Sequence, residues 1–391
     1  MKKLNRNVVV LSFVSFFNDL SNGMIQSVMP VFLNVTLGVP PSGVGLIEGA
    51  ADAIASVLKI VSGRISDRTE RRKLPTMLGY ALSVGTRPLL VIASSFASIA
   101  ALRIIDRVGK GFREAPRDAL LAESADQGDL GRSFNFNRGM DALGGMLGPL
   151  IALAILPLIG NDYRTLFVIA FIVGILALLS FVFVREAPKR VRVFSENDAE
   201  PSLRSERKLL LFVASIFVYG LGTIPLALVL LRPVELGMQY ALVPLLYLLY
   251  NMAFVASTAP FGRLSDRIGE RIVIVIGFVA SIAGYILLAS THSLAGVVVA
   301  FVLFGKGAAA TDGIGRALAA KLVSPRLLAT SEGLLNAAIG FSSLIAGLAA
   351  GYLWEVWGAP AAFLYAAAVS LIGLGIFALV SFNGWVRYRA E

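Results

Sequence analysis

The feature that most constrains this chain is a succession of apolar runs, many of them about 20 residues long. A helix of that length crosses the hydrocarbon core of a bilayer, which is about 30 Å thick. The runs are continuous, whereas the strands of a membrane barrel alternate polar and apolar residues. Because backbone polar groups in lipid must be paired within the protein, the runs predict an all-α polytopic membrane protein.

Composition narrows the possible functions further. Only 15% of the residues are charged, and the net charge of +10 is explained by Lys and Arg in cytoplasmic loops. We therefore expect no nucleic-acid partner. The chain has no Cys and a single His, so we expect no metal site and no thiol chemistry. No sequence motif of an enzyme active site or of a phosphate-binding loop is present, and we expect neither an enzyme nor a cofactor.

The apolar runs predict twelve transmembrane helices. The first six lie near 8–34, 43–65, 75–93, 95–121, 133–158 and 164–184. The second six lie near 208–231, 238–261, 271–290, 293–320, 328–353 and 359–382. The charged segment between them predicts a six-helix bundle over 1–186, a cytoplasmic linker over 187–207 and a second bundle over 208–391.

Lys and Arg are concentrated in alternate connecting segments, which include both termini and the central linker. The opposite segments hold little beyond Arg164 and Arg232. This asymmetry predicts cytoplasmic termini and an even number of spans in the cytoplasmic (inner) membrane. The basic N-terminus precedes an apolar run without a small-residue cleavage site, so we interpret that run as a retained first helix.

Two short motifs occur once in each half. "GRISDR" at Gly63 matches "GRLSDR" at Gly262, and "GKG" at Gly109 matches "GKG" at Gly305. Both pairs are separated by roughly 200 residues. The duplication predicts two pseudo-symmetric six-helix bundles, the usual design of an alternating-access carrier.

These motifs carry a family resemblance. The charged loops resemble the signature loops of the major facilitator superfamily, which follow helices 2 and 8. "RVGKG" at Arg107–Gly111 resembles the helix-4 motif, and "GGMLGP", with Gly144, Gly148 and Pro149, resembles the helix-5 signature associated with antiporters. The Gly-Gly that often follows the latter is absent, since Ala152 and Leu153 occupy that place. The resemblance implies a transporter with the fold of that superfamily.

The resemblance also implies a conformational latch at the loops. Asp67 would face the start of a helix in the other half, near Ser331 and Glu332, while Arg71 and Arg72 would pair with Asp118 or Glu123. Gly63 would let two helices approach closely. The expected latch residues are Gly63, Asp67, Arg68, Arg71, Arg72, Asp118, Gly262, Asp266 and Arg267. A plain basic loop would explain the Arg residues, but neither Asp67 nor the repeat.

The fourth predicted helix carries charges at intervals of three or four residues, which places them on one face. That face must line a water-filled cavity or pair with neighbouring helices, because lipid does not solvate charge. We interpret it as part of the substrate cavity, which this helix borders in the family. The candidates for that cavity are Asn18, Asn22, Gln26, Arg103, Asp106, Arg107, Lys110, Arg113 and Lys306.

Asp19 is the first candidate for proton coupling. It lies mid-span in the first predicted helix, with no basic residue within a turn. Intramembrane acids are costly and are therefore functional candidates. A group in such a place suits proton uptake and release near neutral pH. Glu48 is the second candidate.

These observations leave three functions open. The first is proton-coupled efflux of a small solute by a monomeric secondary transporter. The second is transport or exchange of an organic or inorganic anion, based on the basic helix-4 face. The third is a receptor or scaffold with a carrier fold, for which the sequence offers no additional domain.

Overall fold

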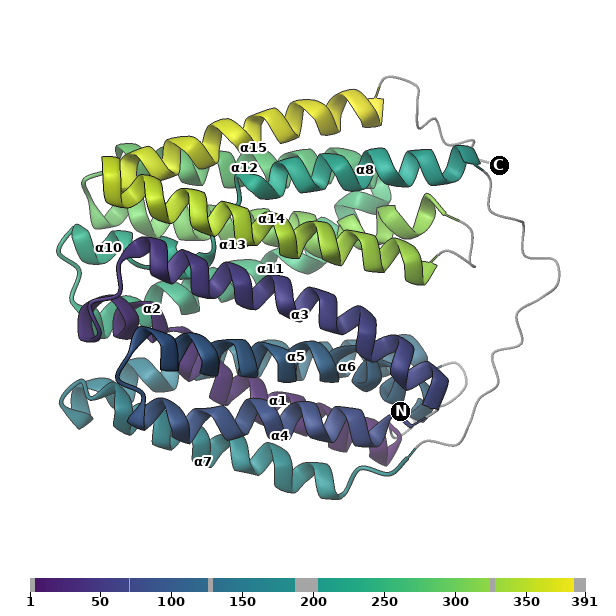
Figure 1. Ribbon diagram of the computed structural model, residues 1–391. Helices are drawn as coiled ribbons and strands as arrows, with labels where there is room; N and C mark the ends of the chain where they lie inside the picture. The colour runs from purple at the N-terminus through teal and green to yellow at the C-terminus, as the bar shows by residue number, and fades with distance from the viewer. Residues whose placement is uncertain (1–3, 70, 126–128, 187–202, 324–327, 383–391) are drawn as a thin grey trace. The chain divides into compact units, whose positions relative to one another are not determined.

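Figure 1 presents the protein as a computed structural model, which describes residues 4–69, 71–125, 129–186, 203–323 and 328–382. Every regular element within these residues is helical. The all-α fold predicted from the apolar runs is therefore confirmed. Most of the predicted linker lies outside the described residues.

The chain divides into two compact units, which are described separately. The first comprises Met1–Val39, Ile54–Arg192 and Met238–Leu248. The second comprises Pro40–Ala53, Val193–Gly237 and Leu249–Glu391. These boundaries differ from the predicted bundles in two places. Residues 40–53 belong to the second unit, and residues 238–248 belong to the first.

The helices up to residue 186 supply most of the first unit. In chain order they are α1 (Arg6–Gln26), α2 (Met29–Val31), the π-helix η1 (Phe32–Thr36), α3 (Pro41–Thr69), α4 (Lys73–Ile92), α5 (Phe96–Ser124), α6 (Leu130–Ile155), the 3-10 helix η2 (Leu156–Ile159) and α7 (Tyr163–Val182). α1 packs against α6 and α7, and α4 packs against α5 and α7 (Figure 1). Their buried apolar side chains include Val8, Leu11, Tyr80, Leu120 and Phe181.

The remaining helices supply most of the second unit. They are α8 (Leu203–Leu221), α9 (Leu226–Val229), α10 (Arg232–Glu235), the 3-10 helix η3 (Tyr240–Leu242), α11 (Val243–Ile268), α12 (Glu270–Ser290), α13 (Leu294–Lys321), α14 (Leu328–Trp357) and α15 (Ala359–Phe382). α12 packs against α13 and α15, and α8 packs against α14 and α15. Tyr219 of α8 stacks on Phe278 of α12, with ring centroids 3.6 Å apart.

Nine helical segments in the described residues are long and apolar enough to cross a membrane. α3, α4 and α5 are comparably long but are not among them. α3 and α5 contain many charged residues, and α4 contains Arg87 and two prolines. The multi-pass helical architecture is thus confirmed, and the count of twelve spans is consistent with it.

Two predicted spans are interrupted. Within 8–34, α1 ends at Gln26 and the chain resumes helical structure at Met29, with Pro30 in the first turn. Within 208–231, α8 ends at Leu221, and the next helix begins directly after Pro225. Proline lacks the N–H group that a continuous helix needs and disfavours helical geometry at the preceding residue.

The first turns of α3 pack tightly on α14 within the second unit. A Cβ atom on Gly49 would lie 2.8 Å from Leu344 Cα and from Ser343 O, and one on Gly45 would collide with Gly347. These contacts bring the two backbones together, because glycine has no side chain to separate them.

The turn before α7 is fixed by local hydrogen bonds. Gly160 adopts φ +66°, and the Asp162 carboxylate accepts hydrogen bonds from the backbone N–H groups of Arg164 and Thr165 at 3.0 and 3.2 Å. The Thr165 hydroxyl also donates to this carboxylate, at 2.6 Å, and this bond lowers the pKa of Asp162. The start of α7 is therefore set by its own sequence.

Candidate functional site

Arginine side chains are buried inside the first unit, on α4 and α5. At most 8% of the surface of each whole residue is exposed, and the set is Arg87, Arg103, Arg107, Arg113 and Arg117. The spacing along α5 places four of them on one face, as the sequence predicts. Their burial means that this face packs against neighbouring helices, which was one of the two arrangements left open.

A hydrogen-bonded chain connects Arg87 to Asp19. Arg87 Nη2 of α4 donates to Asn18 Oδ1 of α1 at 3.0 Å, and Asn18 Nδ2 donates to Asp19 Oδ1 at 3.0 Å. Asp19 is half-buried, whereas Arg87 is only 2% exposed. Gly174 of α7 makes room for this arginine, because a Cβ there would collide with Arg87 Nη1. The structure therefore brings a positive charge towards Asp19 through the Asn18 amide.

Arg87 is absent from the sequence-predicted site residues. The available signal was its isolation, because no other charged residue follows Lys73 in α4. An isolated charge inside an apolar span indicates a buried partner. The sequence could not identify that partner, since Asn18 lies on another helix.

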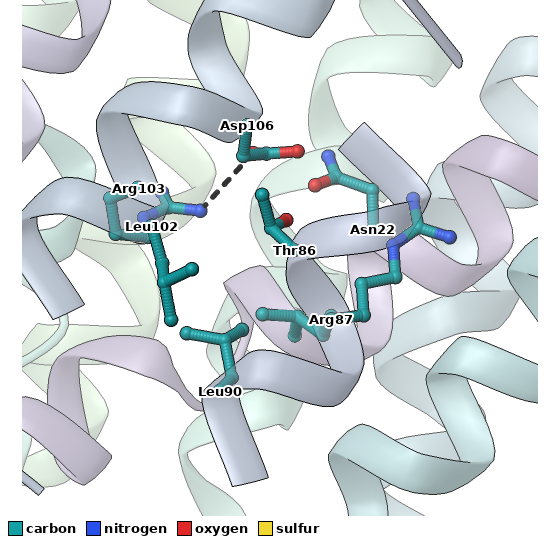
Figure 2. A pocket seen from close by; sticks show the side chains of 8 residues that line it. Asn22, Thr86, Arg87, Leu90, Leu102, Arg103 and Asp106 are labelled. Atoms are coloured by element: carbon teal, nitrogen blue, oxygen red, sulfur yellow. Dashed lines mark ion pairs between the residues drawn. The ribbon is translucent and has the colours of Figure 1, made fainter. Parts of the chain in front are cut away.

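A small pocket lies beside the hydrogen-bonded chain that connects Arg87 to Asp19. It is lined by Asn22, Ile25, Thr86, Arg87, Leu90, Leu102, Arg103 and Asp106, and it is about the size of one water molecule (Figure 2). Arg103 and Asp106 form an ion pair at 3.5 Å on one side of it. Arg103 Nη2 also donates to Gln26 Oε1 at 3.1 Å. Four of the predicted cavity residues, Asn22, Gln26, Arg103 and Asp106, are thus brought together.

Asn18 lies next to this group through its bond with Arg87, and the remaining predicted cavity residues are dispersed. Arg113 donates to Ser83 Oγ at 2.7 Å and lies 4.6 Å from the centre of the Tyr80 ring. Lys110 is 40% exposed and lies 3.8 Å from Glu114, which forms a closer pair of 3.0 Å with Lys59. Arg107 is buried in α5. Lys306 is exposed on α13 and belongs to the second unit.

Glu48, the second proton candidate, lies in the second unit. It is 5% exposed on the first turns of α3. One turn later on the same helix, Asp52 accepts a hydrogen bond from Ser343 Oγ of α14 at 3.4 Å. The two proton candidates therefore belong to different units.

Asp118 lies in an ion-pair network rather than at the loop before α4. Arg117 donates to Asp118 Oδ1 from Nε at 3.0 Å and from Nη2 at 2.9 Å, and Arg138 Nη2 lies 3.5 Å from Asp118 Oδ2. Of the two acids expected to pair with the loop arginines, Glu123 takes that position. Asp118 itself contacts Arg117 and Arg138, and its expected contact with the loop remains a prediction.

The first signature loop is held within its own unit. Arg72 Nε lies 3.2 Å from Glu123 Oε1, and Arg72 Nη1 donates to Ser66 Oγ at 2.8 Å. Arg71 is exposed. A Cβ on Gly63 would meet the Ala115 Cβ at 3.4 Å, an ordinary contact, so the close approach expected there does not require glycine. The side chains of Asp67 and Arg68 lie outside the described residues.

The second copy of the loop is more open. Asp266 and Arg267 are exposed at the end of α11, and a Cβ on Gly262 would meet no atom within 4 Å. The pattern repeats in sequence, but this glycine also makes no tight helix contact.

The Gly-rich motif of α6 makes a tight contact with α1. A Cβ on Gly144 would lie 2.5 Å from Phe16 O and 3.2 Å from Asp19 Cβ. One on Gly148 would collide with Leu20 O, and Pro149 Cδ lies near Gly23. The motif therefore fixes the helix that carries Asp19.

This contact yields a prediction with a matched control. We expect Gly148→Ala to lower the melting temperature of the purified protein, because overpacking costs about 1–3 kcal/mol. Gly145→Ala should melt at or above the parental temperature, since a Cβ there meets open space and alanine favours the helix. Equal melting temperatures for the two variants would contradict the tight α1–α6 contact.

Comparisons with known proteins agree with the fold. The profile of the Major Facilitator Superfamily matches residues 11–258 and 210–389. An uncharacterised MFS-type transporter of Methanocaldococcus jannaschii is 31% identical over 385 residues, covering 95% of this chain and 94% of that protein. The class H tetracycline resistance protein of Pasteurella multocida is 24% identical over 309 residues, covering 73% of this chain and 74% of that protein. The crystal structure of the nucleoside transporter NupG matches with a TM-score of 0.78 at 15% identity, covering 96% of this chain and 99% of that one. The chain therefore belongs to the Major Facilitator Superfamily, as its paired loops predicted.

Proposed function

We propose that this protein is a monomeric secondary transporter of the cytoplasmic membrane, which exports a small solute in exchange for protons by alternating access. Both termini would face the cytoplasm, as the distribution of Lys and Arg predicts. Membership of the superfamily supports transport of a small molecule. The similarity to a tetracycline resistance protein supports the outward direction.

The observation that carries the proton coupling is the chain from Arg87 through Asn18 to Asp19. When Asp19 is ionised, the amide bridge places its charge near the buried guanidinium. Protonation of Asp19 removes the negative charge and weakens this connection between α1 and α4. A carboxyl whose proton changes helix contacts can bind protons differently in two conformations, which is the requirement for coupling.

The alternative of an anion carrier has less support. It requires cations that a substrate can reach, but Arg103, Arg107 and Arg113 are each at most 8% exposed. Arg103 is also paired with Asp106. Of the cations in the predicted cavity, Lys306 is exposed and Lys110 is partly exposed. We therefore place proton-coupled efflux first.

The latch remains part of this proposal. In the described residues, the Arg72–Glu123 pair joins parts of the same unit, so it would hold the loop in shape. The proposed contact with the other half would depend on Asp67.

Two measurements test the proposed function. A thermal-shift screen of the purified protein against tetracycline and panels of drugs, sugars and organic anions would identify ligands, because binding to the folded state raises its melting temperature. Each ligand found would then be added to proteoliposomes containing a pH-sensitive dye. We expect ligand-driven proton movement that empty vesicles lack. Solute movement without proton movement would contradict the coupling, and absence of both would contradict transport.

A further inference from the structure

A second acid, Asp141, lies on the face of α6 that packs against α1. It precedes Gly144 by three residues and Gly148 by seven, so all three lie on one face of the helix. Gly144 is the residue whose Cβ would lie 3.2 Å from Asp19 Cβ. The side chain of Asp141 is 15% exposed. The two acids therefore lie across the α1–α6 contact, about one helical turn apart.

The two oxygens of Asp141 differ in their surroundings. Oδ2 accepts a hydrogen bond from Asn137 Nδ2 at 3.3 Å and lies 3.7 Å from Arg117 Nη1 and 3.8 Å from Arg138 Nη1. Oδ1 is buried and receives no hydrogen bond from any described residue. An ionised carboxylate spreads its charge over both oxygens, so a buried oxygen without a donor is costly.

Asp118 provides the internal comparison, because it shares the same two arginines. It accepts two hydrogen bonds from Arg117 at 3.0 and 2.9 Å, and its other oxygen lies 3.5 Å from Arg138. Both of its oxygens are thus close to a cation, and its contacts are shorter than those of Asp141. Arg117 Nη1, which faces Asp141, also donates to Ser15 Oγ at 3.2 Å. Of the two acids, Asp118 is better held as an ion.

The charges around Asp141 come from every helix near it. Asp19 faces it from α1, Arg117 and Asp118 from α5 and Arg138 from α6, while the buried Tyr80 of α4 lies near the same cluster. The group holds two arginines and three acids, and Arg87 is linked to Asp19 by hydrogen bonds through Asn18. Like charges at short range disfavour full ionisation of all the acids.

We propose that Asp141 is a second proton-carrying carboxyl, which accepts a proton from water on Oδ1 and acts together with Asp19 across the α1–α6 contact. This inference rests on the proposed proton-coupled function. Protonation at Oδ1 leaves the Arg117–Asp118 pair and the Ser15 hydrogen bond in place. The network can therefore gain and lose a proton without being dismantled, while the charge facing Asp19 changes.

Infrared difference spectroscopy of the purified parent protein, recorded between acidic and alkaline pH, tests this directly. A protonated carboxyl has its own C=O stretching band, so the measurement requires neither substrate nor transport. We expect the band of Asp141 to persist near neutral pH in the parent. It should be lost at every pH in Asp141→Asn, whereas the control Asp118→Asn should retain it at acidic pH. Retention in Asp141→Asn, or its loss only in Asp118→Asn, would overturn the assignment.

Asp19→Asn separates the two acids. Removing the facing negative charge should move the protonation of Asp141 to lower pH while preserving its band at acidic pH. Complete loss of the band in Asp19→Asn would assign the proton to Asp19 alone and overturn the inference. If Asp141→Asn does not fold, Asp141→Glu keeps the carboxyl and should shift the pH at which the band disappears. An unchanged spectrum in that variant would contradict the proposal.

The spectroscopic test of Asp141 and the transport test of proton coupling can fail independently of each other. A parent without a carboxyl band near neutral pH would overturn the role of Asp141, even where proteoliposomes carry protons with the solute. The reverse result, a band that Asp141→Asn removes in a protein that moves no protons, would overturn the proposed coupling and with it the role of this residue in transport.

Discussion

Replacement of Asp19 by asparagine is expected to abolish uphill transport while preserving exchange. Asparagine has nearly the shape of a protonated aspartic acid, so the variant is held permanently in the proton-bound form. Its amide oxygen can still accept the hydrogen bond from Asn18, but, like the protonated acid, it offers no negative charge to Arg87. A carrier whose proton occupancy does not change between its conformations can only equilibrate its solute.

Proteoliposomes with an imposed pH difference provide the measurement. With a ligand identified by thermal shift, the parent should accumulate solute, whereas Asp19→Asn should stop at equal concentrations on both sides. Exchange of labelled for unlabelled solute without a pH difference should continue. Accumulation at the parental level would remove Asp19 from the mechanism. Loss of exchange as well would indicate that Asp19 binds substrate.

Glu48→Gln is the matched control for this variant. Both substitutions neutralise an acid of similar size, but Glu48 belongs to the second unit and Asp19 to the first. We expect Glu48→Gln to retain uphill transport. The opposite pattern, with Glu48→Gln uncoupled and Asp19→Asn active, would transfer the coupling role to Glu48.

Local sequence signals were sufficient to predict the helices and to reveal the duplicated motifs. Continuous apolar runs determine where helices cross a membrane, and the spacing of the charges on α5 determines which of them share a face. The spacing did not determine what that face contacts. Arg103, Arg113 and Arg117 are buried, so much of this face of α5 contacts neighbouring helices rather than a broad open cavity.

Partners on other helices could not be predicted from one sequence. Asp19 has no basic residue within a turn, yet Arg87 reaches it through Asn18 from a helix more than 60 residues away. The choice between Asp118 and Glu123 as the partner of Arg72 likewise depends on how α5 is rotated against its neighbours. Periodicity identifies the face of a helix, whereas packing between helices identifies the partner.

The largest loss of stability is expected on replacing Arg117 by methionine. The Arg117 side chain is only 9% exposed. It donates hydrogen bonds to Ser15 and Asp118 and lies 3.7 Å from Asp141. Removal of one partner from a fully buried ion pair leaves the other charge uncompensated and costs about 3–5 kcal/mol. Asp118 is 31% exposed and both acids keep Arg138, so the loss should lie near or below the lower end of that range. Methionine fills most of the volume, so the loss should reflect charge rather than a cavity.

Arg138→Met is the control for this prediction, because Arg138 contacts the same two acids at 3.5 and 3.8 Å but is 61% exposed. Exposed ion pairs contribute about 0–1 kcal/mol, so its melting temperature in detergent should stay near that of the parent. The double variant Arg117→Met/Asp118→Asn should regain part of the stability lost in Arg117→Met, since it also removes the Asp118 charge that has lost its two hydrogen bonds from Arg117. If Arg117→Met and Arg138→Met melt alike, or if the double variant melts below Arg117→Met, the buried network does not stabilise the first unit in the way that these contacts indicate.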